Sequence, residues 1–396
     1  MNPAFQRIKT CLLLFFALFF SNLLSGQTLN PYYQEIVSKV SYDTILSNLQ
    51  KLSNLGIKEP GTAALNNTAD WLVEKYQSYG YTNISRDNFV YNGNQLSNIV
   101  VTKTGTIFPP KYLVIDGHYD TYQGPGINDN GSGVVSILEI ARLLSHLPCS
   151  LSIRFINFSA EEEGLIGSQH YVDQIVVPTN MNIMLVFNID EVGGVNGMIN
   201  NTITCERDED TPTSNNAASY SFTDTLVNLT QLYSNLLTKI YYAYGSDYVP
   251  FQDAGEVITG FYESNESPYP HSPNDVLENM SPAYVTQVAK AATGAALYFA
   301  GSQAVNTSYP LQPQEPACIF PNPASNELQW KIQTISGSYL VKIIGANGQC
   351  IAEKSYTSNS ECSMDISRIN AGLYSVLFYF DNGNSMSVRF VKGLNP

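Results

Sequence analysis

The sequence has little positive charge. Its 396 residues include 20 Lys and Arg against 34 Asp and Glu, a formal net charge of −14. Because binding to nucleic acid requires a basic surface that neutralises phosphates, this balance argues against a nucleic-acid partner, and we expect none. The sequence also lacks the composition of a disordered chain, since 44% of its residues are hydrophobic and 12% are aromatic. It is long enough for one large domain and a smaller one.

Long apolar runs are scarce, and the strongest lies near the N-terminus. Residues 11–20 (CLLLFFALFF) follow Arg7 and Lys9 and precede small and polar residues at 25–27. This is the layout of a secretory signal, and the run is too short for a membrane-spanning helix, which needs about 20 residues. We therefore predict a signal peptide at 1–26, a mature protein without a transmembrane segment, and export to the cell surface or the medium.

Cysteine is also scarce. Five cysteines follow the predicted signal, without a CxxC pair or the spacing of metal ligands: Cys149, Cys205, Cys318, Cys350 and Cys362. An odd count allows at most two disulfides and one free thiol, and the sequence does not assign the pairs. Cys350 and Cys362 are close enough in sequence to pair.

From residue 27 to 304 the chain alternates between helical and strand-like segments. Four segments are helix candidates (62–79, 133–147, 223–242 and 282–299), and four are β-rich (98–102, 112–115, 151–158 and 183–189). The alternation predicts a three-layer α/β/α sandwich around a mixed, largely parallel sheet. Ligands of such folds collect beyond the carboxyl ends of the strands.

A second domain is predicted after a change in composition. Residues 305–317 are rich in Asn, Ser, Pro and Gln, which indicates a linker. Beyond them, short alternating segments with turns at 346–348 and 381–383 favour a small all-β sandwich. The predicted division is a signal peptide, a large α/β domain, a linker and a β-sandwich (1–26, 27–304, 305–317 and 318–396).

Polar motifs follow the predicted strands. His118 comes directly after the strand YLVID, and Asp120 is suitably placed to fix the tautomer and orientation of that histidine. Asp129 lies in the Gly-rich loop PGINDNGSG, where glycines permit close approach of a carboxylate to a metal ion. The alternative for this loop is that Asp129 or Ser132 caps the following helix.

Three consecutive acids, Glu161, Glu162 and Glu163, follow the strand RFINF. Carboxylates directly after a buried strand are costly unless they bind a cation. Hydrolysis at a metal needs one carboxylate as a ligand and a second as general base, and adjacent glutamates supply both if their side chains diverge. The alternative is a solvated acidic turn.

Two further motifs complete a mixed donor set. Asp190 ends the strand IMLVFNI, and His271 lies on a Pro-rich loop after VITGFY. Histidine nitrogens combined with carboxylate oxygens suit zinc, with cobalt or manganese as substitutes. We expect the two remaining histidines, His146 and His170, to be structural.

The strings GHYD, PGINDNGSG, SAEEEGLIGS, NIDEVGG and HSPND stand in the order found in the co-catalytic dizinc aminopeptidase family, which includes secreted bacterial leucine aminopeptidases. The resemblance covers residues 45–300. It implies a zinc metallopeptidase that removes N-terminal residues from peptides or proteins with two Zn²⁺ ions per chain. The implied metal ligands are His118 and Asp190 for one ion, Glu162 and His271 for the other, and Asp129 bridging both.

The same resemblance implies roles for the remaining site residues. Glu161 would be the general base that takes a proton from the bridging water, and Asp120 would orient His118. The Asp129–Asn130 peptide bond is expected to be cis. One departure concerns Tyr248, which replaces the histidine of the family pattern SDHxPF and puts any substrate-side role of that histidine in doubt. Four aromatic residues either line a substrate pocket or belong to the core: Phe251, Phe261, Tyr262 and Tyr269.

The C-terminal segment resembles the sorting domain of type IX secretion substrates, through FPNPASN, AGLY and RFVK at 320–326, 371–374 and 389–392. The resemblance implies a partnership with the type IX secretion machinery and export across the outer membrane. The alternative is an appended β-sandwich that binds carbohydrate or a partner.

Other functions remain open for the large domain. A glutaminyl cyclase shares the expected fold but uses one zinc, and the same family includes carboxypeptidases. A catalytically dead binding scaffold is the non-enzyme alternative. The complete set of five ligands, together with Glu161, favours hydrolysis.

Overall fold

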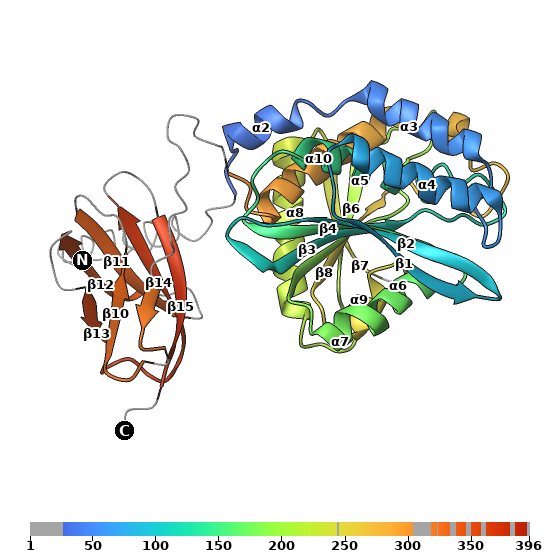
Figure 1. Ribbon diagram of the computed structural model, residues 1–396. Helices are drawn as coiled ribbons and strands as arrows, with labels where there is room; N and C mark the ends of the chain where they lie inside the picture. The colour runs from blue at the N-terminus through green and yellow to red at the C-terminus, as the bar shows by residue number, and fades with distance from the viewer. Residues whose placement is uncertain are drawn as a thin grey trace, which may run out of the picture. The chain divides into compact units, whose positions relative to one another are not determined.

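The computed structural model describes residues 27–243, 245–303, 318–322, 324–332, 338–345, 350–357, 362–380 and 385–393 (Figure 1). The chain divides into two compact units at residue 305. The predicted signal peptide (1–26), the linker (305–317) and the turns at 346–348 and 381–383 lie outside the described residues. No helix in the described ranges is both long and apolar enough to cross a membrane.

The larger unit is built on an eight-stranded sheet with the strand order β1-β2-β4-β3-β5-β8-β6-β7. The strands are β1 (Ile84–Tyr91), β2 (Asn94–Lys103), β3 (Phe108–His118), β4 (Leu151–Phe158), β5 (Ile183–Ile189), β6 (Thr202–Arg207), β7 (Leu237–Tyr242) and β8 (Ile258–Glu263). The central strands β4, β3, β5 and β8 run parallel, whereas β2 and β6 are antiparallel to their neighbours β4 and β8. Strands buried on both faces need apolar side chains on both, so these segments read as continuous apolar runs.

Helices cover both faces of the sheet (Figure 1). One face carries α2 (Pro31–Val37), α3 (Tyr42–Leu55), α4 (Ala63–Ser78), α5 (Gly131–Leu144), α8 (Asn216–Tyr233) and α10 (Pro282–Phe299). The other carries α6 (Ile166–Tyr171), the π-helix η1 (Val172–Val176), α7 (Val177–Thr179) and α9 (Val249–Asp253), and a 3₁₀ turn, η2, spans Leu277–Asn279. The predicted three-layer α/β/α sandwich is confirmed.

Two predicted helices differ in detail from the structure. The segment predicted as one helix over 223–242 is the end of α8 and then β7, because residues 237–242 (LTKIYY) are β-branched or aromatic at most positions and pair in parallel with β6. Helix α5 begins at Gly131, and its N-cap is Asn130, whose side chain accepts the Gly133 amide at 2.9 Å. The alternative that Asp129 or Ser132 caps this helix is therefore wrong.

The smaller unit contains only β-strands among its described residues. A three-stranded sheet, β13-β10-β9, and a four-stranded sheet, β12-β11-β14-β15, are antiparallel throughout. The strands are β9 (Cys318–Phe320), β10 (Glu327–Lys331), β11 (Ser338–Gly345), β12 (Cys350–Thr357), β13 (Ser363–Asp365), β14 (Gly372–Phe380) and β15 (Ser385–Lys392). Trp330 and Phe378, one from each sheet, share a buried core, so the predicted all-β sandwich is confirmed.

Three of the cysteines whose side chains the structure describes are free: Cys149, Cys205 and Cys350. The suggested pairing of Cys350 with Cys362 is therefore not formed.

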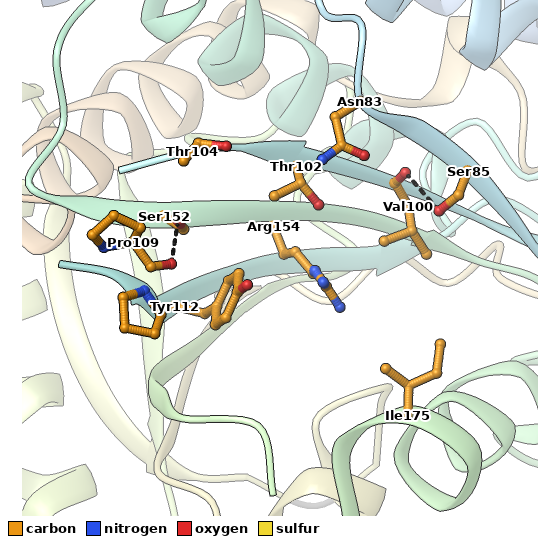
Figure 2. A pocket seen from close by; sticks show the side chains of 11 residues that line it. Asn83, Ser85, Val100, Thr102, Thr104, Pro109, Tyr112, Ser152, Arg154 and Ile175 are labelled. Atoms are coloured by element: carbon orange, nitrogen blue, oxygen red, sulfur yellow. Dashed lines mark hydrogen bonds between the residues drawn. The ribbon is translucent and has the colours of Figure 1, made fainter. Parts of the chain in front are cut away.

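A cavity of about 540 Å³ lies against strands β2, β3 and β4 of the larger unit (Figure 2). Its lining includes Thr102 from β2, Tyr112 from β3, Arg154 from β4 and Ile175 from η1. Tyr112 and Arg154 precede the last residues of their strands by several positions, so the cavity does not lie at the strand ends where the polar motifs of the sequence occur.

Candidate metal centre

Adjacent parallel strands bring the predicted site residues together. His118 is the last residue of β3, Glu161 and Glu162 follow β4, and Asp190 follows β5. Because β4, β3 and β5 are neighbours in the sheet, their carboxyl ends open onto one edge. Asp129 joins them from the loop before α5.

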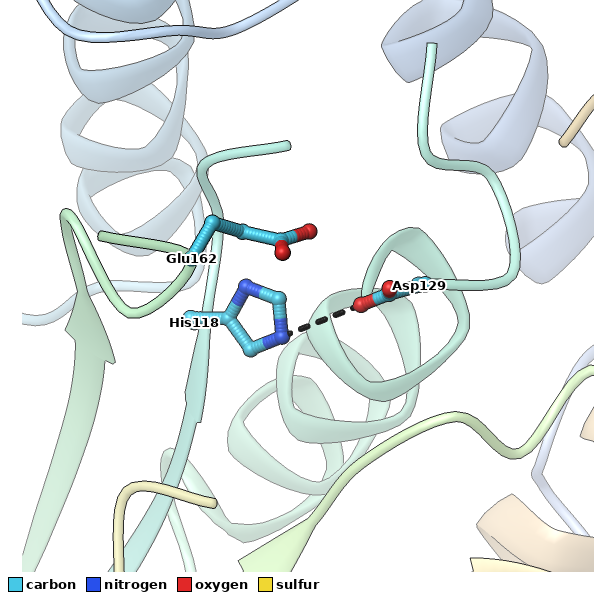
Figure 3. Close-up of side chains that lie close together, drawn as sticks. All are labelled: His118, Asp129 and Glu162. Atoms are coloured by element: carbon cyan, nitrogen blue, oxygen red, sulfur yellow. Dashed lines mark ion pairs between the residues drawn. The ribbon is translucent and has the colours of Figure 1, made fainter. Parts of the chain in front are cut away.

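The donor atoms form two groups that share Asp129. His118 Nε2 lies 3.3 Å from Asp129 Oδ1 and 3.3 Å from Asp190 Oδ1. His271 Nε2 lies 2.8 Å from Glu162 Oε2 and 3.3 Å from Asp129 Oδ2. Each oxygen of Asp129 therefore faces a different histidine. Figure 3 shows the His118 imidazole beside the carboxylates of both Asp129 and Glu162, with its ion pair to Asp129 dashed.

The side chains present fit metal ions. His118, Asp129 and Glu162 each offer a ligand atom, and these atoms lie within 4.8 Å of one another. Asp190 Oδ1 and Glu162 Oε1 are buried without a hydrogen-bond partner among the described residues. A buried carboxylate oxygen that accepts no hydrogen bond is costly unless a cation lies beside it. Imidazole nitrogen and carboxylate oxygen together are a donor set suited to zinc.

Asp120 positions the residues around it through several contacts. Its carboxylate accepts the backbone amides of Glu161 and Glu162, each at 3.2 Å. His118 Nδ1 lies 3.3 Å from the Asp120 backbone oxygen and 3.6 Å from Asp120 Oδ1. Asp120 therefore fixes the backbone of both glutamates and lies beside the ring nitrogen of His118 that faces away from Asp129.

Two residues whose roles the sequence did not indicate hold the carboxylates in place. Asp275 accepts the backbone amides of Asn128 (2.8 Å) and Asp129 (3.0 Å). Ser246 Oγ donates to Asp190 Oδ2 at 2.7 Å. The only sequence signal for either residue was its place inside a motif, HSPND for Asp275 and SDYVPF for Ser246. The Asp129–Asn130 peptide bond is cis, as the family resemblance implied.

The loop before α5 packs closely against the segment that carries His271. A Cβ atom on Gly124 would lie 1.9 Å from the backbone oxygen of Ser272. Only glycine allows the two backbones to approach this closely. Gly124 therefore lets the loop that carries Asp129 come close to the segment that carries His271.

Burial and mutual repulsion shape the titration of the donor cluster. Burial raises the pKa of Glu161 to about 8 and the pKa of Glu162 to about 10, and neighbouring carboxylates add to both shifts. For Asp129, burial acts in the same direction, but hydrogen bonds from His118 and His271 outweigh it and hold its pKa below the ordinary range. Without a bound cation, the cluster therefore holds protons at neutral pH.

The same physics predicts how the metal-free protein responds to pH. Burial raises the pKa of Asp116 from 3.8 to about 7 and the pKa of Glu263 from 4.5 to about 7. The folded state binds more protons than the unfolded state between about pH 4 and pH 7, so its stability falls as pH rises through this window. We expect a melting temperature lower at pH 8 than at pH 5 by roughly 5 °C in chelator, measured by scanning calorimetry.

Zinc should reverse this trend, because metal binding requires deprotonated ligands and strengthens as pH rises. Zinc added at pH 8 should raise the melting temperature, since a ligand that binds only the folded state stabilises it. A metal-free melting temperature that rises steadily from pH 5 to pH 8 would contradict the assignment of protonated buried carboxylates.

Lys58 is a buried cation beneath the loop that carries Asp129. Its Nζ donates to the backbone oxygens of Pro125 (2.5 Å) and Gly56 (3.0 Å), and its backbone amide donates to Thr121 Oγ1 (2.9 Å). Burial lowers its pKa to about 8, although nearby acids oppose the shift. Lys58 therefore ties the loop to the segment before α4 at several points.

Lys58→Met should loosen this loop and weaken metal binding. The substitution leaves two partly buried backbone oxygens without this donor, at a cost of up to about 1–3 kcal/mol each. We expect zinc affinity to fall about tenfold, as for other residues that support ligands indirectly, measured by competition with a chelating dye. Lys39→Met is the matched control, because Lys39 is exposed and its ammonium group pairs with Glu35 on the surface. Equal zinc affinity in Lys58→Met and wild type would contradict a positioning role.

Several side chains considered for the site belong to the interior. Tyr248 is only 1% exposed, and its hydroxyl donates to Glu206 Oε1 at 3.2 Å. Phe251 and Phe261 are fully buried in the two cores of the larger unit, so neither lines a substrate pocket. His170 lies 3.1 Å from Asp87 Oδ1 and is not among the metal donors.

Comparison with known families agrees with this architecture. Residues 98–296, half of the chain, match the model of peptidase family M28, and the chain belongs to this family. Residues 318–392 match the model of a secretion system C-terminal sorting domain.

Individual relatives are similar over parts of the chain. Aminopeptidase YwaD of Bacillus subtilis is 36% identical over 214 residues, which cover 51% of this chain and 44% of YwaD. The LapA aminopeptidase of Legionella pneumophila has a similar structure, with a TM-score of 0.60 and 22% identity over 71% of this chain and 81% of LapA. A glutaminyl cyclase of Macrostomum lignano has a TM-score of 0.60 and 15% identity over 71% of this chain and 97% of the cyclase. These two structures support the fold alone, and the chain spans less than half the length of YwaD.

Proposed function

We propose that the protein is a secreted aminopeptidase that uses two zinc ions to hydrolyse the N-terminal peptide bond of peptides or proteins. The observation that carries the proposal is the geometry of Asp129, whose two oxygens each lie 3.3 Å from a different histidine. His118 and Asp190 would hold one ion, and His271 and Glu162 the other. One carboxylate shared by two donor groups suits a pair of neighbouring metal ions.

Bound zinc would lower the pKa of the attacking water and polarise the scissile carbonyl. Glu161 acts as general base in this proposal, taking a proton from that water and returning it to the leaving amine. Its Oε2 lies 3.9 Å from His118 Nε2, beside the donors but outside both ligand groups. The Asp120 carboxylate accepts the Glu161 backbone amide and thereby fixes the position of the proposed base.

The proposal is tested by hydrolysis of aminoacyl-nitroanilides with and without a chelator, together with zinc analysis. The expected result is chelator-sensitive release of nitroaniline and two zinc ions per chain. N-terminally blocked peptides report carboxypeptidase activity, and one ion per chain with cyclisation of N-terminal glutamine would instead favour a glutaminyl cyclase. If no free-amine substrate is hydrolysed in a chelator-sensitive reaction, the proposed aminopeptidase activity is wrong.

We also propose that the chain is organised as a signal peptide, a peptidase domain, a linker and a type IX sorting domain (1–26, 27–304, 305–317 and 318–396). The match of residues 318–392 to a sorting-domain model supports the last assignment. Deletion of 318–396 in a host with this secretion system should retain active enzyme inside the outer membrane. Unchanged export of the truncated chain would contradict the assignment of 318–396 as a sorting domain.

A further inference from the structure

The cavity against β2, β3 and β4 is separate from the metal donors. Arg154 precedes Phe158, the last residue of β4, by four positions, and Tyr112 precedes His118 by six. At about 3.3 Å per residue, these backbone positions lie about 13 Å and about 20 Å from the ends of their strands. A group bound in this cavity would therefore not touch the donor cluster.

Arg154 is held in a fixed position inside the cavity (Figure 2). Its guanidinium carbon lies 5.0 Å from the centre of the Tyr112 ring. Its Nη1 donates to the Tyr171 hydroxyl and lies 3.7 Å from Met181 Sδ. Contacts to the ring face and to one nitrogen fix the plane of the guanidinium, while its remaining N–H groups are not used by these contacts.

Arg154 differs from the other arginines described in the larger unit. Arg86, Arg142 and Arg207 each have a carboxylate oxygen at 2.6 to 2.7 Å. Around Arg154, no carboxylate oxygen within the described ranges lies within 4.0 Å, and its Nε is buried without a hydrogen-bond partner. A partly buried arginine is normally paired with an anion. In a chain with a net charge of −14, an arginine without an acidic partner is conspicuous.

Two further polar residues of the cavity lining follow Arg154 across the sheet. Thr102 is its direct partner in the antiparallel pairing of β2 with β4. The Thr102 amide in turn donates to the backbone oxygen of Asn83 at 2.9 Å. Thr102 and Asn83 both line the cavity, so a guanidinium, a hydroxyl and a carboxamide follow one another across neighbouring strands. All three can donate hydrogen bonds.

We propose that this cavity is an anion site that takes a carboxylate group, with Arg154 as its cation and Thr102 and Asn83 as further donors. The planar fork of a guanidinium matches a carboxylate or a related oxyanion. The volume, about 540 Å³, exceeds that of a single ion and lies in the range of small-molecule sites. A carboxylate carried by a peptide is therefore the ligand that uses the cavity most fully.

The test is a titration of the full chain, kept free of metal with a chelator so that no probe is hydrolysed. The probes are N-acetyl-trialanine with a free C-terminal carboxylate, the same peptide with a C-terminal amide, and inorganic phosphate. We expect the free carboxylate to bind with a dissociation constant at least tenfold lower than that of the amide, measured by isothermal titration calorimetry. We expect Arg154→Met to weaken carboxylate binding at least tenfold.

Arg86→Met is the matched control, because Arg86 belongs to the same sheet but is already paired with Asp70. It should bind the peptide as wild type does. If Arg154→Met does not fold, Thr102→Val carries the test, with at least threefold weaker binding expected. Binding of phosphate but not of the peptide would overturn the peptide carboxylate as ligand and assign the site to a free oxyanion.

Equal peptide binding in wild type and in Arg154→Met, or in Thr102→Val where that variant carries the test, would overturn the anion site itself. The absence of saturable binding of any probe would also overturn it. Because binding is measured without metal, these outcomes are independent of whether the chain is an aminopeptidase.

Discussion

Glu161→Gln should lower kcat about a thousandfold and leave the zinc content unchanged, within the range usual for loss of a general base. Glutamine keeps the size and an acceptor oxygen of the side chain but cannot carry the proton. Glu161 lies outside both ligand groups, with its nearest histidine nitrogen at 3.9 Å. The measurement is steady-state hydrolysis of leucine nitroanilide alongside zinc analysis by mass spectrometry.

Glu163→Gln is the matched control, because Glu163 belongs to the same acidic run but accepts the Tyr91 hydroxyl at 3.0 Å. It should keep activity within about threefold of wild type, as expected for a group that does not take part in proton transfer. A Glu161→Gln enzyme that retains more than a tenth of wild-type kcat would show that another group accepts the proton. Loss of zinc in this variant would show that Glu161 is a ligand and not the base.

Asp129→Ala should abolish activity and lower the zinc content to well below two ions per chain. The reason is that Asp129 contributes one oxygen to each donor group, so both groups lose a ligand at once. Alanine also removes the negative charge between the two histidines. Zinc stoichiometry after dialysis against a weak chelator, followed by the nitroanilide assay, measures both effects.

The control for this substitution is Asp173→Ala, because Asp173 is an exposed acid on η1 that accepts a hydrogen bond from Gln169. It should retain both ions and full activity. If Asp129→Ala still held two zinc ions, the shared-carboxylate arrangement would be wrong, and the two histidine groups would have to bind metal independently.

The strand ends were predictable from the sequence because local patterns determine them. YLVI and IMLVFNI are short, largely apolar runs typical of a strand buried on both faces, and a polar residue follows each. Once these strands are parallel neighbours, His118 and Asp190 must open onto the same edge. The placement of these donors therefore follows from topology without knowledge of side-chain contacts.

The supporting residues could not be predicted in this way. Lys58 meets Pro125 and Asp275 meets Asn128 across sequence separations of 67 and 147 residues. No periodicity or motif reports contacts between loops so far apart. The predicted helix over 223–242 failed for a related reason, because residues 237–242 become a strand only through pairing with β6.

The departure at Tyr248 is also clear only in the structure. As a replacement for a histidine in the family pattern, it marked a possible change at the substrate side. Its side chain instead lies in the interior beside Glu206. The replacement of histidine by tyrosine therefore does not by itself indicate a changed substrate side.

The contact between Asp120 and the two glutamates has a mechanical consequence. One carboxylate accepts two consecutive peptide amides, so a displacement of Asp120 would carry the backbone of both Glu161 and Glu162 with it. In the proposed reaction, the base Glu161 and the ligand Glu162 would then be displaced together. A general base must stay within hydrogen-bond reach of the proton it takes, so this shared anchor would keep the proposed base and the proposed ligand in register when the turn moves.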